Sequence, residues 1–308
     1  MSDDYLEPTT QLSAEFAVVI PAFNAEATLM ASIESAHSAG ASEVIVVDDG
    51  STDSTAALCR AHDIRVLTQP NAGAYLARRR GAELVTAPYI VFLDADDLLV
   101  ASGVHESLRI LSAQADCAVV AGRVMASLPR GRSRLNNQSY SEINTRTLLT
   151  QGYGPFPPGA ALVRRADYEA AIALDVPEIV ERYADDYEMF IRLSVVGRIV
   201  QHNTVSLVYS MYAGKSIGSP EKSLLCKESI RGHYARHLGI NVRLMNASAV
   251  AAAANARMGR ASFAQGLYWR GCTKVVVAAC YKVLSRLGNS GLKQSTIVSG
   301  AGTSEARG

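Results

Sequence analysis

The sequence predicts an α/β fold in which a mostly parallel sheet is flanked by helices and followed by a helical C-terminal extension. Three observations support this prediction. Short apolar runs alternate with helical patterns from residue 16 to residue 93, as in a parallel sheet with crossover helices. Several of these runs end in clusters of polar residues, and the pattern from Pro220 onward is helical without further strands. With 308 residues, 48% of them hydrophobic, the chain can bury a sizeable core.

The first half of the chain predicts four strands and three helices. We expect residues 1–14 to be a disordered lead. The expected strands are Phe16–Ile20, which Pro21 would end, then Val44–Val47, Ile64–Leu67 and Tyr89–Leu93. The expected helices run from an Asn24 cap to about Ser38, from Asp53 or Ser54, and over Ala74–Val85.

The second half is less regular. Residues 126–158 are rich in Arg, Ser, Asn, Gly and Pro, which indicates a long mobile stretch. After it we expect a strand at Gly159–Arg165, a helix at Asp185–Val196, and one or two strands within Ile199–Tyr209. The predicted organisation is a sheet domain at 15–218, divided into halves at 15–125 and 126–218. A helical region at 219–288 and a disordered tail at 289–308 follow.

Composition narrows the function classes. The net charge of +1 argues against bulk nucleic-acid binding. The five cysteines lack metal-ligand or disulfide spacing, which favours a reducing compartment. Residues 1–13 do not resemble a signal peptide, and no apolar run is long enough to predict a membrane span. We therefore expect a cytoplasmic protein.

The segment YIVFLDADDL, residues 89–98, carries the strongest chemical signal. An apolar run ends in Asp94, Asp96 and Asp97, whose carboxylates repel one another unless a cation is present. Oxygen ligands of this kind suit Mg²⁺ or Mn²⁺, which commonly meet a substrate's phosphates. The alternative is an acidic surface loop after a core strand. Two other polar clusters, Pro21–Asn24 and Asp48–Asp49, follow strands of the same predicted sheet, so a ligand site is expected at that edge.

Four segments together resemble the inverting nucleotide-sugar transferases of glycosyltransferase family 2, which have the GT-A fold. They are VVIPAFNAEATL (18–29), VIVVDDGSTDST (44–55), QPNAGAYLARRRGAELVTAPYIVFLDADD (69–97) and ADDYEMFIRLSVVG (184–197). Their order and spacing also match, over roughly residues 16–215. The resemblance implies a nucleotide-diphosphate sugar donor, most commonly a uridine nucleotide. It also implies that residues 15–218 form the catalytic domain, with a nucleotide-binding half at 15–125 and an acceptor half at 126–218.

The resemblance also implies a binding site for the donor. The residues that would form it are Pro21, Ala22, Phe23, Asn24, Asp49, Asn71, Gly73, Arg78, Asp94, Ala95, Asp96 and Lys215. Asp49 would accept a hydrogen bond from the base, while Asp48 would support its turn. Arg78 would contact the diphosphate or support the acidic loop. Phe23 could instead be a plain core residue.

The chemistry follows from the two acidic segments. Asp96, with Asp94 and Asp97, would bind Mg²⁺ or Mn²⁺, which takes up charge on the leaving diphosphate. Asp186 matches the family's general base, which removes the acceptor proton while the sugar is displaced with inversion. Asp185 matches a neighbouring acid that positions hydroxyl groups. The alternative for this pair is an acidic helix start favoured by the helix dipole.

Three departures from the family pattern are present. Arg79 stands where the family often has Asn, and Asp185 stands where Glu is commoner. The segment 209–212, Tyr-Ser-Met-Tyr, replaces a Tyr-Arg-x-His pattern, so a third protein ligand for the metal is not evident. Lys215 could contact the diphosphate instead.

The C-terminal segment 268–287 predicts a basic amphipathic helix, which could form a hairpin with residues 249–265. Its cations are Arg270, Lys274, Lys282 and Arg286. The commoner arrangement packs such a helix against the catalytic domain with a solvated basic face. The alternative is peripheral contact with the inner face of an anionic membrane.

The predicted activity is therefore glycosyl transfer to a glycan, lipid-linked or small-molecule acceptor, in polysaccharide, glycan or glycolipid biosynthesis. A nucleotidyltransferase is the enzymatic alternative, but it would carry a Gly-rich loop with Arg and Lys after the first strand. A non-catalytic nucleotide-sugar binding protein would lack the base that Asp186 supplies.

Overall fold

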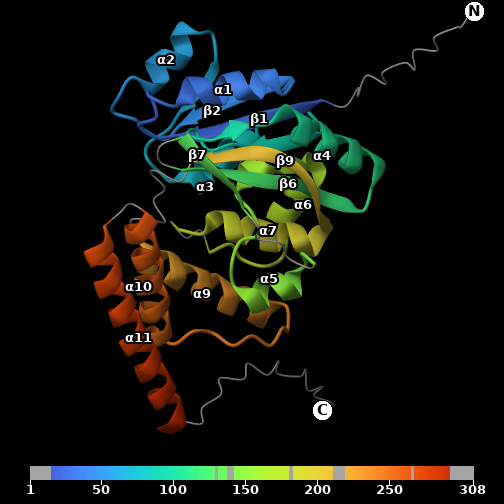
Figure 1. Ribbon diagram of the computed structural model, residues 1–308. Helices are drawn as coiled ribbons and strands as arrows, with labels where there is room; N and C mark the ends of the chain where they lie inside the picture. Colours follow the sequence, from blue (N-terminus) through green and yellow to red (C-terminus); the bar gives the residue numbers. More distant parts are fainter. Residues whose placement is uncertain are drawn as a thin grey trace, which may run out of the picture.

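The computed structural model describes residues 15–128, 131–136, 142–179, 183–210, 219–264 and 267–291. The expected disordered lead at 1–14 and most of the expected tail lie outside these ranges. In the described residues the strands form one nine-stranded sheet in the order β3-β2-β1-β4-β8-β6-β9-β5, with β7 paired to β6. Helices cover the sheet, and a helical part follows it (Figure 1). The predicted fold class is confirmed.

The first four strands form a parallel half-sheet. They are β1 (Phe16–Ala22), β2 (Glu43–Asp48), β3 (Arg65–Thr68) and β4 (Tyr89–Phe92). The connecting helices are α1 (Leu29–Ser38), α2 (Thr55–Ala61) and α3 (Ala74–Ala82). The strands β1, β2 and β4 are almost wholly buried, as expected for a sheet covered on both faces. Their carboxyl ends therefore meet at one edge.

The second half of the sheet mixes directions. Its strands are β5 (Leu98–Leu99), β6 (Cys117–Leu128), β7 (Arg132–Leu135), β8 (Ala161–Arg164) and β9 (Arg198–Ser210). Strand β8 runs antiparallel to β4 and β6, whereas β6 and β9 run parallel to each other. The short β5 pairs with β9, so the acidic segment between β4 and β5 is held at both ends by the sheet.

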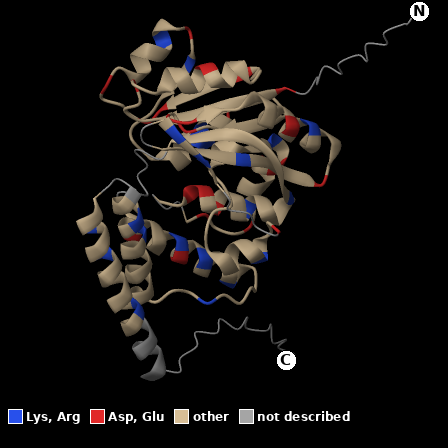
Figure 2. Cartoon of the chain, viewed as in Figure 1, with Lys and Arg blue, Asp and Glu red and all other residues tan. Residues whose placement is uncertain are grey.

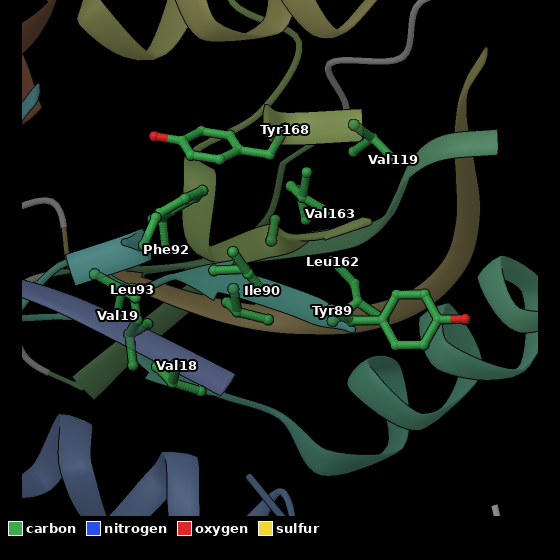
Figure 3. Close-up of a cluster of buried hydrophobic side chains, with 14 of the residues drawn as sticks. Val18, Val19, Tyr89, Ile90, Phe92, Leu93, Val119, Leu162, Val163 and Tyr168 are labelled. Atoms are coloured by element: carbon green, nitrogen blue, oxygen red, sulfur yellow. The ribbon is translucent and has the colours of Figure 1, made fainter. Parts of the chain in front are cut away.

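The main core lies where the two halves of the sheet join. Figure 3 shows Ile90 and Phe92 of β4 beside Val163 of β8 and Tyr168 of the following helix. The rings of Phe92 and Tyr168 lie 5.0 Å apart. Burying several such side chains stabilises the fold by about 1.5–3 kcal/mol each. This packing fixes the base from which the acidic loop emerges.

Five further helical segments complete the sheet domain. They are α4 (Ala101–Ala113), α5 (Thr145–Gln151), the 3₁₀ turn η2 (Pro158–Ala160), α6 (Arg165–Ile172) and α7 (Asp185–Val196). An Asn144 capping box starts α5, with Thr147 N–H donating to Asn144 Oδ1 at 2.8 Å. Helix α7 begins and ends where the sequence predicted.

The C-terminal part consists of α9 (Pro220–His237), α10 (Ala247–Ala264) and α11 (Tyr268–Gly291). The last two form a hairpin beside α9, away from the sheet (Figure 1). The main packing partner of α11 is α10 rather than the catalytic domain, so the commoner arrangement expected for this helix is wrong. Within the described ranges, no helix combines the length and the apolar character that crossing a bilayer requires.

Three local predictions were wrong. Strand β1 continues through Pro21 to Ala22, because a proline near the end of a strand removes little from the ladder. Asn24 does not cap α1, which begins at Leu29 after Thr28, because the Asn24 side chain binds the neighbouring turn instead. The stretch 126–158 is not one long loop, since it includes the end of β6, all of β7 and α5.

Candidate active site

The turns after β1 and β2 are tied to each other. Asn24 N–H donates to Ser51 Oγ at 2.9 Å, and Thr52 N–H donates to Asn24 Oδ1 at 2.8 Å. Asn24 takes a positive φ of 50°, a conformation that Asn tolerates better than most residues. Phe23, next to Asn24, is 39% exposed, so it is not a core residue.

Asp49 organises the next part of the edge. Its carboxylate accepts hydrogen bonds from Gln69 Nε2 at 2.8 Å and from the N–H groups of Ala72 and Gly73 at 2.7 and 2.8 Å. Gly50 is required here, because a Cβ at its φ of 76° would lie 3.0 Å from Asn71 N. The buried Asp49 thus shapes the 69–73 turn, and Asp48 supports its own turn by accepting from Ser51 N–H at 3.1 Å.

The acidic loop follows β4 as the sequence predicted, but its three carboxylates do not share one environment. Asp97 is buried, and Ser210 N–H donates to its Oδ1 at 2.8 Å, while Oδ2 lacks a hydrogen-bond partner among the described residues. Burial and the neighbouring Asp94 raise the pKa of Asp97 to about 8. The same two causes raise the pKa of Asp96. Both carboxyl groups therefore keep a proton more readily than a free aspartic acid, and a cation at the loop would favour their ionised forms.

Arg78 bridges the two acidic segments. From α3, its Nη2 lies 2.6 Å from Asp94 Oδ1, and its Nη1 lies 2.5 Å from Asp185 Oδ2. The guanidinium is buried, which by itself disfavours its charge, but Asp94 and Asp185 raise its pKa. Arg78 thus holds Asp185, 107 positions further along the chain, and Asp94, 16 positions further, at one guanidinium group.

Helix α7 presents Asp185 and Asp186 in its first turn, where the helix dipole favours negative charge. Ala184 precedes them with φ 67°, a left-handed conformation that is strained for a residue with a Cβ. Burial and the carboxylates of Asp186 and Asp94 raise the pKa of Asp185, although Arg78 opposes the shift. Gly154 lies beside this pair, since a methyl group built on it would lie 3.9 Å from Asp186 Oδ2, an ordinary van der Waals contact.

The predicted metal ligands do not form a complete cage. Among the described residues, no three acidic, histidine or cysteine side chains converge closely enough to hold an ion. The reason is that Asp97 bonds to Ser210 while Asp94 pairs with Arg78. Mg²⁺ commonly uses only one or two carboxylates and completes its shell with substrate phosphates and water. Asp96 with Asp94 fits that mode, and the unpartnered Asp97 oxygen fits a nearby positive charge.

A narrow cavity lies behind the Asp185–Asp186 pair. Its lining includes Tyr75, Arg78, Tyr168, Glu188, Met189 and Arg192. Glu188 is buried, and its Oε1 accepts hydrogen bonds from the Tyr234 hydroxyl at 2.7 Å and Ile179 N–H at 2.9 Å. Its Oε2 has no partner among the described residues. Arg192 fastens α7 to α6 by donating to the carbonyl oxygens of Ala171 and Ile172.

Three residues near the site were not singled out as functional by the sequence. Lys227 of α9 lies over the Tyr187 ring at 5.8 Å, and burial lowers its pKa while Asp186 opposes that shift. Tyr209 is half-buried, and burial together with Asp97, Asp94, Asp186 and Asp96 raises its pKa. Glu178 explains the departure at Arg79, because the two form an ion pair of 2.8 Å.

The structure therefore brings most of the predicted donor-binding residues to one edge of the sheet. Lys215 lies outside the described residues. So do positions 211 and 212 of the segment 209–212, which differs from the family pattern. From the sequence, a functional role for Lys227 could have been predicted only from its place on a helix with alternating charges, which is a weak signal.

Comparison with known proteins agrees with this arrangement. A family model described as "Glycosyl transferase family 2" matches residues 17–171, half of the chain. The chain is 32% identical over 136 residues to "Uncharacterized glycosyltransferase YibD" of Escherichia coli K12, covering 39% of this chain and 40% of that protein. It is 35% identical over 98 residues to a "PGL/p-HBAD biosynthesis glycosyltransferase" of Mycobacterium bovis BCG, covering 27% and 36%. The matches thus span less than half the length of these relatives.

Solved structures share the fold. The crystal structure of residues 1–349 of TarS from S. aureus aligns with a TM-score of 0.55 at 16% identity, covering 90% of this chain and 92% of that one. A complex of the same fragment with UDP-GlcNAc aligns equally well, with a TM-score of 0.55. The family model covers the turns after β1 and β2 and the acidic loop, and this chain belongs to glycosyl transferase family 2.

Proposed function

We propose that the chain transfers a sugar from a nucleotide-diphosphate sugar to an acceptor hydroxyl with inversion at the anomeric carbon. The observation that carries this proposal is the Arg78 bridge, which places the acidic loop and the Asp185–Asp186 pair around one buried cation. A donor diphosphate at the loop would then present its sugar toward the start of α7.

In this proposal Asp49 and the 69–73 turn bind the base. The hydrogen bond from Asn24 N–H to Ser51 Oγ fixes the neighbouring turns beside the base. A divalent ion held by Asp96 and Asp94 would offset charge on the leaving diphosphate. Asp186 removes the proton from the acceptor hydroxyl as its oxygen bonds to C1 of the sugar. The bond from C1 to the phosphate oxygen breaks on the opposite face, and the nucleoside diphosphate leaves with the electron pair.

Asp185 has a supporting role in this scheme. Its ion pair with Arg78 holds the start of α7 against α3, so it fixes the position from which Asp186 acts. The cavity next to the pair has an unpartnered carboxylate oxygen on Glu188, which suits a hydroxyl group or a water molecule. We infer that a donor or acceptor hydroxyl group approaches from this side.

A donor screen tests the proposal. UDP-sugars come first, because TarS, which shares the fold, was solved with UDP-GlcNAc. The purified chain is incubated with each nucleotide sugar and Mn²⁺, and thermal stabilisation and release of nucleoside diphosphate are measured. We expect at least one donor to stabilise the protein and to be hydrolysed slowly, with loss of hydrolysis in Asp186→Asn.

The screen also separates the alternatives. Release of inorganic pyrophosphate from a nucleoside triphosphate and a sugar phosphate would identify a nucleotidyltransferase instead. Stabilisation by donors without hydrolysis or transfer, in wild type and Asp186→Asn alike, would identify a binding protein and contradict the proposed base.

A further inference from the structure

Helix α11 exposes a continuous apolar face. Trp269, Val276 and Val283 recur seven residues apart and are 82%, 62% and 56% exposed. Seven residues are close to two helical turns, so these side chains lie on one side of the helix. Four further exposed residues broaden the face: Tyr268, Cys272, Ala279 and Cys280. Apolar patches of this kind on a folded protein mark interaction sites.

The opposite side of α11 is used for packing. Gly271 and Ala278 are buried against α10, also seven residues apart. A Cβ added at Gly271 would lie 2.9 Å from the Phe263 ring, so the two helices approach closely at this small residue. The hairpin is thereby closed on its inner side. On the outer face, Tyr268 at the edge lies against Phe263 with ring centroids 6.3 Å apart, while Trp269, Val276 and Val283 are left exposed.

The hairpin carries only positive charge. Neither α10 nor α11 contains Asp or Glu, and the sequence has no acidic residue between Glu228 and Glu305. Arg257 and Arg260 lie on α10, while Arg270, Lys274 and Lys282 lie on α11. Figure 2 shows blue residues and no red ones on these two helices. On a helical projection, Arg270 and Lys282 fall at the two borders of the apolar face.

The positive charge of the hairpin indicates which kind of partner would cover the apolar face of α11. A second copy of the chain would bring two acid-free, cationic hairpins together, which is unfavourable. An anionic lipid surface offers the complementary charge and accepts apolar side chains at the boundary between headgroups and acyl chains. Trp and Tyr are enriched at that boundary. Helix α11 has Tyr268 and Trp269 on its exposed apolar face, as expected for a helix at that boundary.

We propose that this face of α11 docks the protein on an anionic membrane surface. The side chains of Trp269, Val276 and Val283 enter the interface, and Arg270 and Lys282 at the borders of the face contact the lipid headgroups. The docking is peripheral and is independent of the donor chemistry proposed above. Its consequence for function is that acceptors presented at a lipid surface become accessible.

The single tryptophan of the chain provides a local probe. The full-length protein, without nucleotide, is mixed at low ionic strength with vesicles of phosphatidylcholine alone or with phosphatidylglycerol. Sedimentation and Trp fluorescence are recorded. We expect co-sedimentation and a blue shift of the Trp269 emission with the anionic vesicles only, and both should weaken as salt is added.

Two sets of variants separate the contributions. Val276→Asp with Val283→Asp should lower partitioning at least about tenfold, because charged side chains enter the apolar interface poorly. Replacement of Arg270 and Lys282 by Gln should lower it about fivefold per cation and weaken the salt dependence. Leu225→Asp is the matched control, since Leu225 is an apolar α9 residue that is 50% exposed but lies off this face. Circular dichroism verifies that each variant is folded.

Absence of co-sedimentation with anionic vesicles at low salt would overturn the proposal. Unchanged binding by the folded Val276→Asp, Val283→Asp variant would also overturn it. A concentration-dependent dimer that this variant converts to a monomer would show that a second copy covers the face. Donor hydrolysis is measured without vesicles. A negative result in the vesicle experiment therefore leaves the transferase proposal intact, and a negative result in the donor screen leaves the docking proposal intact.

Discussion

Arg78 and Asp185 form an ion pair in which Nη1 lies 2.5 Å from Oδ2, and it connects α3 to the start of α7. The same guanidinium reaches Asp94, so a single buried cation lies between two acidic segments. Its Nε atom has no hydrogen-bond partner among the described residues. The pair therefore depends on its two carboxylates, and a ligand that displaces either of them would change the geometry of both segments.

Replacement of Arg78 by Met should destabilise the protein by about 3–5 kcal/mol, because it leaves partly buried carboxylates without their cation. Nucleoside diphosphate binding should be lost at the same time. Chemical unfolding and calorimetric titration measure the two effects. The control is Arg80→Met on the same helix, where the side chain is exposed and unfolding should change by less than about 0.5 kcal/mol. Equal effects of both variants would contradict the bridging role.

Asp186→Asn should lower the transfer rate at least about 10²-fold while the dissociation constant for the donor stays nearly unchanged. The amide keeps the shape of the side chain but cannot remove a proton. Donor affinity by titration and transfer under saturating donor separate the two quantities. Asp175→Asn, an exposed position outside the site, is the control. A variant at position 186 with near-normal transfer would remove Asp186 from the role of base.

Asp96→Ala should abolish the dependence of nucleoside diphosphate binding on metal. Without a cation, a diphosphate meets the acidic loop with no positive charge to offset the carboxylates of Asp94 and Asp96, so wild-type affinity should rise strongly when Mn²⁺ replaces a chelator. Titration of the diphosphate into both proteins, with and without Mn²⁺, gives the four affinities. If wild-type affinity is the same in both conditions, the metal assignment at this loop is wrong.

The parallel half of the sheet was predictable because each of its strands is a short apolar run that ends in turn residues. The register of β1 with β2 then brings Ala22 opposite Asp48, which explains why separate motifs meet at one edge. The second half was harder. Strand β6 is long and loses its buried character toward Leu128, and β7 is polar with three exposed positions, so neither gives a clear alternation.

The candidate site was predictable as a set of positions but not as a set of contacts. Asp185 was placed beside Asp186 from the motif, yet its pairing with Arg78 depends on how α3 and α7 pack against each other. The proximity of Lys227 to Asp186 depends on how α9 returns to the catalytic domain. No local pattern encodes such long-range contacts, because they arise from tertiary packing.

Lys227→Met should lower the transfer rate while raising the melting temperature by about 2–4 °C. Burial disfavours the charge of Lys227, so its removal relieves a cost in the folded state, whereas a fixed cation beside Asp186 suits an anionic substrate. Differential scanning calorimetry and a transfer assay measure the two effects. Lys222→Met, an exposed position on the same helix, should change neither. A variant at 227 with lower stability and full activity would indicate a purely structural lysine.

The last prediction concerns His202 on β9, outside the candidate site. Its Nδ1 accepts a hydrogen bond from Thr204 N–H at 3.1 Å, so Nε2 carries the proton and faces Ser107 Oγ at 2.8 Å. Burial lowers the pKa of His202 below its ordinary value of 6.5, with Glu106 opposing and Arg109 assisting the shift. The folded protein therefore holds this ring neutral where the unfolded chain takes up a proton.

The sign of the pH effect follows from that difference. Above pH 6.5 the ring is neutral in both states, so the stabilisation is fully present, and it is lost as the pH falls through the folded-state pKa. His202→Gln should make the unfolding free energy less dependent on pH below 6.5, as measured by urea denaturation at a series of pH values. His62→Gln, at an exposed position, should leave the wild-type pH dependence in place. If the two variants give the same profile, His202 is not the group responsible.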